Sequence, residues 1–215
     1  PAEAHVVHPV TGGRERVTLT RGTFGEVVRA MMYTPTGARA LPLSVHEAYR
    51  GDYSALATAA LLRQRNMLRE GWVGLYLAVT CAEDIARADE AATYAKNRGT
   101  ILGDFRAKQH FGACNGWPLR PDGEEWPAGQ TTPPVLMIVG DQDPVTPPRW
   151  AELAMNNASR ARLVVVPQGG HGFAGMSDAA CLGTVQRAFV DGLVSQALDT
   201  RCVAAMRRLP FLTTR

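Results

Sequence analysis

The chain has 215 residues, a formal net charge of +3 and an apolar fraction of 46%. At about 150 residues per domain, this length corresponds to one or one and a half domains, and the composition excludes a disordered chain. The sequence shows no concentrated basic stripe of the kind that nucleic-acid-binding proteins carry. Its longest apolar runs, 72–79 and 135–139, fall far short of the roughly 18 residues that span a bilayer. We therefore expect neither a nucleic-acid partner nor a membrane span.

The first twenty residues are expected to be extended, with a turn at Gly12–Gly13. A helix is predicted to begin at Thr23, with Glu26 completing a capping box. Apolar side chains then recur at helical spacing, and Pro35 and Gly37 are expected to end the helix. Residues 1–20 thus form a lead-in to a helical region.

Helices dominate the prediction for residues 21–116. Further helical segments are expected at 41–50, from 52 or 54 to about 70, at 85–97 and at 101–113. The composition changes after Cys114, where prolines and glycines become frequent. Residues 117–134 are therefore predicted to be a linker.

The pattern beyond the linker alternates between strands and helices. Two continuous apolar runs, 135–139 and 163–166, are typical of strands buried on both faces. Thr146 is expected to cap a helix that begins at Pro147 and runs to about 157. Ser177 or Asp178 is expected to cap a second helix to about 197. This predicts an α/β segment over 135–200, followed by a tail, 201–215, tied by Cys202.

The number of predicted strands is small for this pattern. Strands buried on both faces need neighbouring strands and helices on either side, yet the first hundred residues are mostly helical. The chain also begins at Pro1 without an apolar signal segment. We therefore expect that polypeptide outside these 215 residues completes the sheet.

Two residues lie where the predicted strands end. Asp143 follows the first strand and His171, between glycines, follows the second. In open α/β sheets, ligands bind at the carboxyl ends of the strands, and adjacent parallel strands would bring these two loops together. An aspartate beside an imidazole fixes its tautomer and lets it act as a general base. Singly, Asp143 is better explained as a turn residue and His171 as an ordinary histidine, but together they predict a catalytic pair.

The four cysteines, at positions 81, 114, 181 and 202, allow two disulfides in three connectivities, or four buried free thiols. Proximity in sequence favours the pairs Cys81–Cys114 and Cys181–Cys202. Disulfides would indicate a compartment outside the reducing cytosol. None of the spacings, nor the His46–Glu47 pair, favours a metal site.

In these motifs, the sequence resembles the C-terminal part of the α/β-hydrolase superfamily. Within it, the similarity is to secreted tripeptidyl-aminopeptidase-like serine peptidases related to proline iminopeptidases. The resemblance extends over nearly the whole chain, and two motifs, at 140–147 (Gly-x-x-Asp-Pro-Val-Thr-Pro) and 170–172 (Gly-His-Gly), carry most of it. Shorter stretches support it at 41–43, 46–48, 51–52, 81–84, 114–118 and 207–211.

The resemblance implies that Asp143 and His171 are the acid and base of a catalytic triad, that 21–116 form a helical lid, and that the two favoured cysteine pairs are disulfides. It implies no cofactor. The nucleophile of such enzymes lies in a G-x-S-x-G elbow before the acid and the histidine. No serine of this sequence lies in such an elbow, so the N-terminal half of the hydrolase is expected to be absent and the chain alone to be inactive.

The resemblance implies a peptide substrate, from whose N-terminus short peptides or amino acids are released. The disulfides place the protein in an extracytoplasmic compartment, secreted or periplasmic, as an expectation. Glu83 and Asp84 are candidates to pair with the ammonium of the substrate, against the alternative of a solvated acidic turn, and Trp117 is a candidate to line the pocket. Two other functions remain open, an esterase or lipase-like hydrolase and a non-catalytic binding partner.

Overall fold

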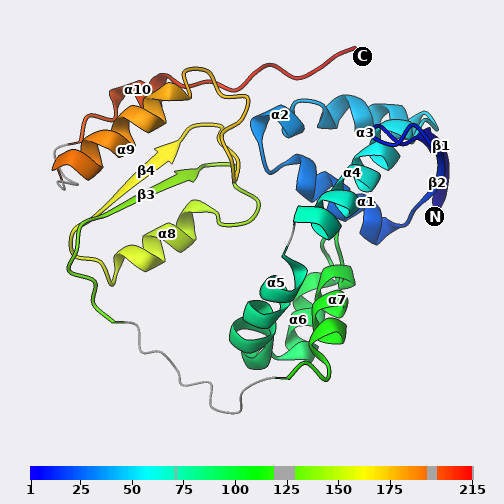
Figure 1. Cartoon of the computed structure of the whole chain (residues 1–215), viewed down its shortest axis with the longest axis horizontal. Coiled ribbons are helices and arrows are strands. Elements are labelled where there is room, and N and C mark those ends of the chain that lie inside the picture. Colours follow the sequence, from blue (N-terminus) through cyan, green and yellow to red (C-terminus); the bar gives the residue numbers. More distant parts are fainter. Residues whose placement is uncertain (71, 119–128, 193–197, 215) are drawn as a thin grey trace. The chain divides into compact units, whose positions relative to one another are not determined.

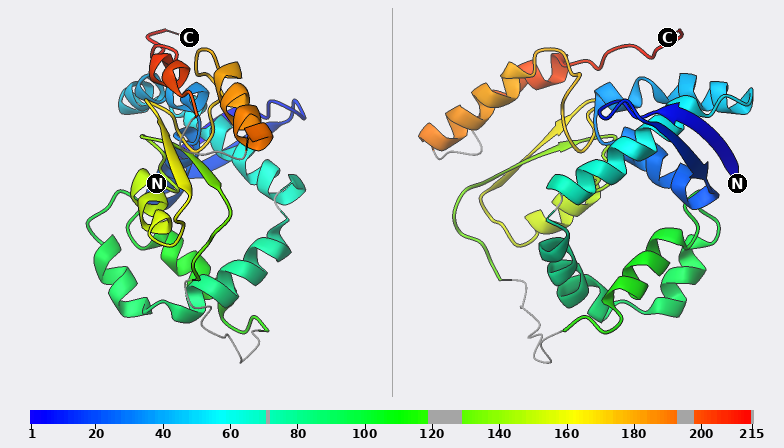
Figure 2. Two further views of the ribbon diagram at one scale, coloured as in Figure 1. Left: turned by 90° about the vertical axis from the view of Figure 1, so that its left-hand side faces the viewer. Right: turned by 45° about the vertical axis from the view of Figure 1, so that its right-hand side comes forward.

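The computed structural model describes residues 1–70, 72–118, 129–192 and 198–214. These residues form two compact units, which are described separately. Unit 1 comprises Pro1–Val28 and Ser44–Glu125, and unit 2 comprises Arg29–Leu43 and Trp126–Arg215. The elements of both are labelled in Figure 1, and Figure 2 shows two further views. Of the predicted linker, residues 119–128 lie outside the described residues.

Unit 1 starts with an antiparallel hairpin, whose two strands account for the extended segment that the sequence predicts on either side of a turn at Gly12–Gly13. Strand β1 (Ala2–Val7) pairs with β2 (Arg14–Leu19), with Ala4 opposite Val17. One face of the hairpin is buried and packs against helix α4 (Ser54–Glu70). Alternating burial along both strands provides the apolar side chains of this contact, which are Ala4, Val6, Val17 and Leu19.

Helix α1 (Arg21–Met31) begins two residues before the predicted start at Thr23. The hydroxyl of Thr20 accepts the N–H of Thr23 at 3.1 Å, so Thr20, and not Thr23, caps the first turn. Glu26 is buried and accepts hydrogen bonds from Arg63 of α4 at 2.9 Å and from Arg106 at 3.2 Å. The capping-box prediction for Glu26 is therefore wrong, because this carboxylate balances two guanidinium groups in the interior of unit 1.

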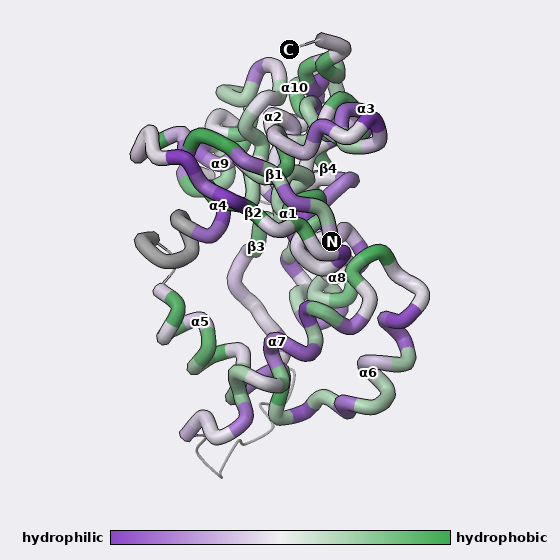
Figure 3. Tube along the Cα trace, turned by 90° about the vertical axis from the view of Figure 1, so that its right-hand side faces the viewer, coloured by the Kyte–Doolittle hydropathy of each residue, from purple (hydrophilic) through white to green (hydrophobic). Residues whose placement is uncertain are grey.

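The remaining helices of unit 1 are short. Helix α5 (Val73–Val79), which the sequence did not predict, leads into a π-helical turn, η1 (Thr80–Asp84), and a 3₁₀ turn, η2 (Ile85–Arg87). Helices α6 (Glu90–Asn97) and α7 (Phe105–Cys114) follow, so the helix predicted at 85–97 is interrupted before Asp89, which caps α6. The apolar residues of α5 form a green stretch in Figure 3, and none of them is buried.

Unit 2 contains a small parallel sheet, which agrees with an α/β fold class. Strand β3 (Val135–Gly140) pairs with β4 (Ala161–Val166) in register from Val135–Ala161 to Gly140–Val166. Both predicted strands are confirmed, and they are the only two strands of this sheet among the described residues. Because Val165 remains 40% exposed, β4 is not covered on both faces as its apolar run predicts.

Helices lie on both sides of this sheet (Figures 1 and 2). Helix α8 (Pro148–Met155) contacts both strands, and α10 (Arg201–Ala205) contacts β4 on the side of helix α9 (Ala180–Gly192). The core between the strands and α9 and α10 contains the buried side chains of Val164, Val166, Met176, Cys181, Leu182, Val185, Val203 and Met206. Residues 193–197, to which the α9 prediction extended, lie outside the described residues.

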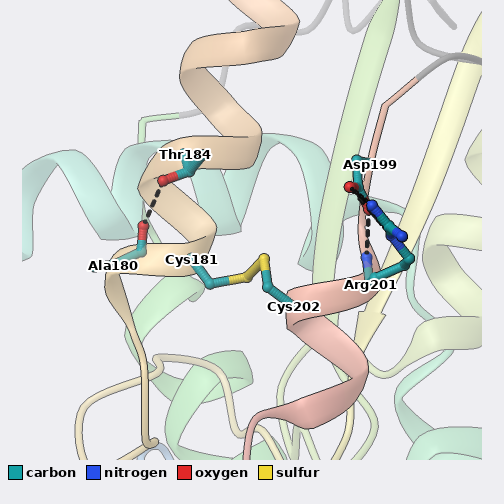
Figure 4. Close-up of a disulfide and its surroundings, with 6 residues drawn as sticks. All are labelled: Ala180, Cys181, Thr184, Asp199, Arg201 and Cys202. Carbon is teal, nitrogen blue, oxygen red and sulfur yellow. Dashed lines mark hydrogen bonds and ion pairs between the residues drawn. A yellow bond between two sulfur atoms is a disulfide. The ribbon is translucent and has the colours of Figure 1, made fainter.

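A disulfide joins α9 to α10 (Figure 4). Cys181 is bonded to Cys202, 21 residues further along the chain, so the predicted tie of the tail is present. Closing a loop of this length stabilises a fold by about 3 kcal/mol in the chain-entropy model. The bond holds the C-terminal segment on the core of unit 2.

The C-terminal segment also uses Ser177, which the sequence predicts as a helix cap. Its hydroxyl accepts the N–H of Arg207 at 3.0 Å, and its own N–H donates to the Arg207 carbonyl at 2.7 Å. The capping prediction for Ser177 is therefore wrong, since α9 begins only at Ala180. Ser177 instead pairs the loop before α9 with the chain end.

Two short helices follow α1 in the chain. Helix α2 (Pro35–Ala38) begins at the proline that was expected to end the preceding helix, and Thr34 caps it by accepting the N–H of Gly37. Helix α3 (Leu41–Tyr49) follows as predicted. Pro35 is thus a first-turn proline, a position where the missing N–H has no cost.

Candidate active site

The carboxyl ends of β3 and β4 bring two loops of unit 2 together. Gly140, the last residue of β3, lies opposite Val166, the last residue of β4. Beyond the strands, the N–H of Asp141 donates to the Val166 carbonyl at 3.1 Å, and that of Gln142 donates to the Gly169 carbonyl at 3.0 Å. The loop containing Asp143 is therefore hydrogen-bonded to the loop containing His171.

This approach depends on glycine at the end of β3. A Cβ atom at Gly140 would lie 2.2 Å from the Gly169 carbonyl oxygen and 2.4 Å from that of Gly170. Both contacts are with backbone, which cannot move aside as a flexible side chain can. Only the absence of a side chain at this position allows the two loops to meet.

Asp143 is buried in its own turn. Its Oδ1 accepts the backbone N–H groups of Val145 at 2.7 Å and Thr146 at 3.0 Å, while its Oδ2 accepts the Thr146 hydroxyl at 2.9 Å. Burial raises the pKa of the Asp143 carboxyl, but these hydrogen bonds and one from His171 outweigh it, so that the pKa lies below its usual value. The site thus holds an ionised carboxylate.

His171 is bound to this carboxylate through Nδ1, which lies 3.0 Å from Asp143 Oδ2. An ionised carboxylate can only accept hydrogen bonds, so Nδ1 carries the proton and Nε2 is the free acceptor of the neutral ring. The aspartate side chain is 4% exposed and the imidazole 41%. The buried carboxylate therefore orients an accessible imidazole, an arrangement that is suited to proton transfer.

Thr146 belongs to the same cluster, although the sequence predicts it as a helix cap. Its hydroxyl lies 2.9 Å from Asp143 Oδ2 and 3.3 Å from His171 Nδ1. Helix α8 begins at Pro148, with Pro147 at its N-cap position, so the capping prediction is wrong. The spacing Asp-x-x-Thr was the available signal, because an aspartate readily accepts N–H groups two and three residues ahead.

The loop containing His171 is hydrogen-bonded to the segment that leads into α2 and to the first turn of that helix. The N–H of Gly172 donates to the Tyr33 carbonyl at 2.8 Å, and the N–H of Thr36 donates to the Ala174 carbonyl at 2.9 Å. Nothing in the sequence indicates this contact, because Tyr33 precedes His171 by more than a hundred residues. Both segments belong to unit 2.

The other predicted site residues lie in unit 1 and are not joined to Asp143 or His171 by any described interaction. Glu83 and Asp84 are exposed on the π-helical turn η1, and Trp117 is half-buried just after α7. The disulfide between Cys81 and Cys114 connects these two places, as the sequence favours. Single π-helical turns are frequent at functional sites.

Over the described ranges, no group of three or more His, Cys, Asp or Glu side chains is arranged to hold a metal ion. Likewise, no helix in the described part of the chain has the length and apolar character needed to cross a bilayer.

We predict that Gly140→Ala separates the two loops and lowers the free energy of unfolding by about 1–3 kcal/mol, because the new methyl group meets backbone atoms. Gly183→Ala is the matched control. Nothing lies within 4 Å of a Cβ at this helical position, and the change should stabilise α9 by up to about 1 kcal/mol. Denaturant unfolding of both variants measures the difference, and equal effects would contradict the close-approach argument.

The lowered pKa of Asp143 predicts a pH-dependent stability. Its stabilisation is complete above the unfolded-state pKa of about 3.9 and is lost as the pH falls through the lower folded-state pKa. In Asp143→Asn this contribution should vanish, so the difference in unfolding free energy from the wild type should shrink below about pH 4. Asp141→Asn, an exposed change in the same loop, is the control. A constant difference across the acid range would refute the assignment.

The chain is similar in part to a known protein family. Residues 100–202 match the family model described as TAP-like protein, a segment that contains both Asp143 and His171. No curated protein and no solved structure matches the chain. The family match is shorter than the resemblance drawn from the motifs, which extended over nearly the whole chain. Residues 100–202 are therefore similar to the C-terminal part of the TAP-like α/β-hydrolases.

Proposed function

We propose that this chain supplies the acid, the base and the lid of a serine-type hydrolase that releases amino acids or short peptides from peptide N-termini. The observation that carries the proposal is the 3.0 Å bond between buried Asp143 and accessible His171 at the ends of two parallel strands. His171 Nε2 would take the proton of a hydroxyl nucleophile and later deliver it to the leaving amine. Asp143 would stabilise the imidazolium formed in between.

The nucleophile of this reaction is proposed to lie outside these 215 residues. The sequence has serines at 44, 54, 159, 177 and 195, and none lies in a G-x-S-x-G elbow. Ser177, the nearest in sequence to His171, uses its hydroxyl to accept a backbone N–H from Arg207. The exposed Val165 and the two-stranded sheet support a further part of the protein that extends the sheet and carries the nucleophile.

The lid is proposed to be residues 21–116, and its acidic turn to bind the substrate's ammonium group. Glu83 and Asp84 are exposed on η1, and the Cys81–Cys114 disulfide fixes this turn to the end of α7. A free amine needs a nearby carboxylate to remain charged once water is excluded. Trp117, three residues beyond the same disulfide, is proposed to line the apolar part of the pocket.

The two disulfides also support an oxidising, extracytoplasmic location, secreted or periplasmic. In a reducing cytosol such bonds are rarely retained. This location would suit an enzyme that acts on peptides outside the cell.

The role of His171 is tested in the full-length protein that contains this chain. His171→Ala should lower kcat for an aminoacyl p-nitroanilide by 10³-fold or more, on the order of the loss caused by removing a triad member. His46→Ala, at an exposed histidine on α3, is the control and should retain activity. A fluorophosphonate probe should label a serine outside these residues. Near-normal turnover in His171→Ala would sink the proposal.

The substrate class is tested through the acidic turn. Glu83→Gln should raise KM for an aminoacyl p-nitroanilide and leave turnover of p-nitrophenyl acetate unchanged, because only the first substrate carries an ammonium group. Glu90→Gln, an exposed change in the first turn of α6, is the matched control. Faster hydrolysis of the ester than of the anilide, with no effect of Glu83→Gln, would favour an esterase. Absence of both activities and of probe labelling would favour a non-catalytic partner.

A further inference from the structure

The imidazole of His171 has a further neighbour besides Asp143 and the Thr146 hydroxyl. The ring of Tyr33 lies with its centroid 5.3 Å from that of His171, and the two rings are nearly perpendicular, at 79°. Edge-to-face pairs at this separation are favourable beyond the area they bury. Tyr33 therefore packs against the one ring that the proposed reaction would protonate.

Tyr33 is itself held in place from α1. The guanidinium of Arg29, four residues earlier, donates to the Tyr33 hydroxyl at 2.8 Å and lies 5.2 Å from the centre of its ring. This pairing combines a hydrogen bond with a cation–π contact. The tyrosine ring consequently has a fixed position next to the imidazole.

The glycines around His171 are explained by this contact. A Cβ atom at Gly170 would lie 2.6 Å from the Tyr33 carbonyl oxygen, and one at Gly172 would lie 3.3 Å from the Thr34 methyl group. At Gly175, which has φ +90°, a Cβ would lie 2.4 Å from the Thr36 hydroxyl. The loop needs its glycines so that residues 33–36 can pack directly against it.

We propose that Tyr33 is a positioning residue that fixes the ring plane of His171, an inference that rests on the proposed function. The carboxylate of Asp143 holds the imidazole at Nδ1, and Tyr33 packs against the ring itself. Because the imidazole is 41% exposed, these two contacts restrict its rotation together with the Thr146 hydroxyl. With both contacts, Nε2 keeps one direction toward the nucleophile, and general-base catalysis depends on that alignment.

The test uses the full-length protein and two readouts. Tyr33→Leu should shift the ring-proton NMR resonances of His171, because the ring current of the tyrosine is lost, and should lower kcat by about three- to tenfold with KM unchanged. Tyr33→Phe keeps the ring and should restore the resonances and most of kcat. Tyr49→Leu makes the same change at a tyrosine that is 89% exposed and should match the wild type.

A purely structural role would alter stability without this pattern. If Tyr33→Leu does not fold, Tyr33→Met keeps the apolar volume without a ring and replaces it. Unchanged resonances and kcat in either variant overturn the proposal, as does an equal loss of kcat in Tyr33→Phe. Loss of turnover in His171→Ala with normal kcat in Tyr33→Leu overturns the positioning role alone. Full activity in His171→Ala overturns the proposed function, whatever the resonances show.

Discussion

The close approach of two backbone segments at the ends of β3 and β4 is the constraint on which the candidate site depends. Gly140 contacts the carbonyl groups of Gly169 and Gly170, and this contact sets the separation of the two loops. At that separation, the side chains of Asp143 and His171 reach hydrogen-bond distance. The geometry of the site therefore depends on Gly140, which has no side chain. The parallel register of the strands determines which residues meet there.

In unit 1, a buried charged side chain joins separate helices. Glu26 of α1 accepts hydrogen bonds from Arg63 of α4 and Arg106 of α7. A buried carboxylate without such partners would be strongly destabilising. The same packing brings Gly22 against Phe105 and Gly25 against Leu102. Long-range pairing of this kind fixes α1, α4 and α7 to one another in a unit whose α5 has no buried residue.

The sequence predicted the parts of the structure that local pattern determines. Periodicity predicts both parallel strands and the extended N-terminal segment. Proximity in sequence favours the observed pairing of the cysteines, and strand order brings Asp143 to His171. The wrong predictions concern residues whose partners lie far away in the chain, or whose side chains bind a nearby residue in place of a helix end. Thr146 and Ser177 look like helix caps, yet their hydroxyls bind Asp143 and Arg207. Glu26 resembles a capping-box residue until α4 and α7 are packed against it. No local signal could reveal Tyr33 beside His171, because only the folded chain brings them together.

Residues 207–212 also support the loop that follows His171. The N–H of Leu209 donates to the Gly175 carbonyl, Arg207 and Ser177 exchange hydrogen bonds, and the N–H of Leu212 reaches the carbonyl of Arg39. Residues 207–212 thus connect the loop after His171 to the segment after α2. An affinity tag that begins beyond Leu212 would leave these hydrogen bonds intact, whereas a protease that trims the chain back to α10 would remove them and leave both disulfides in place.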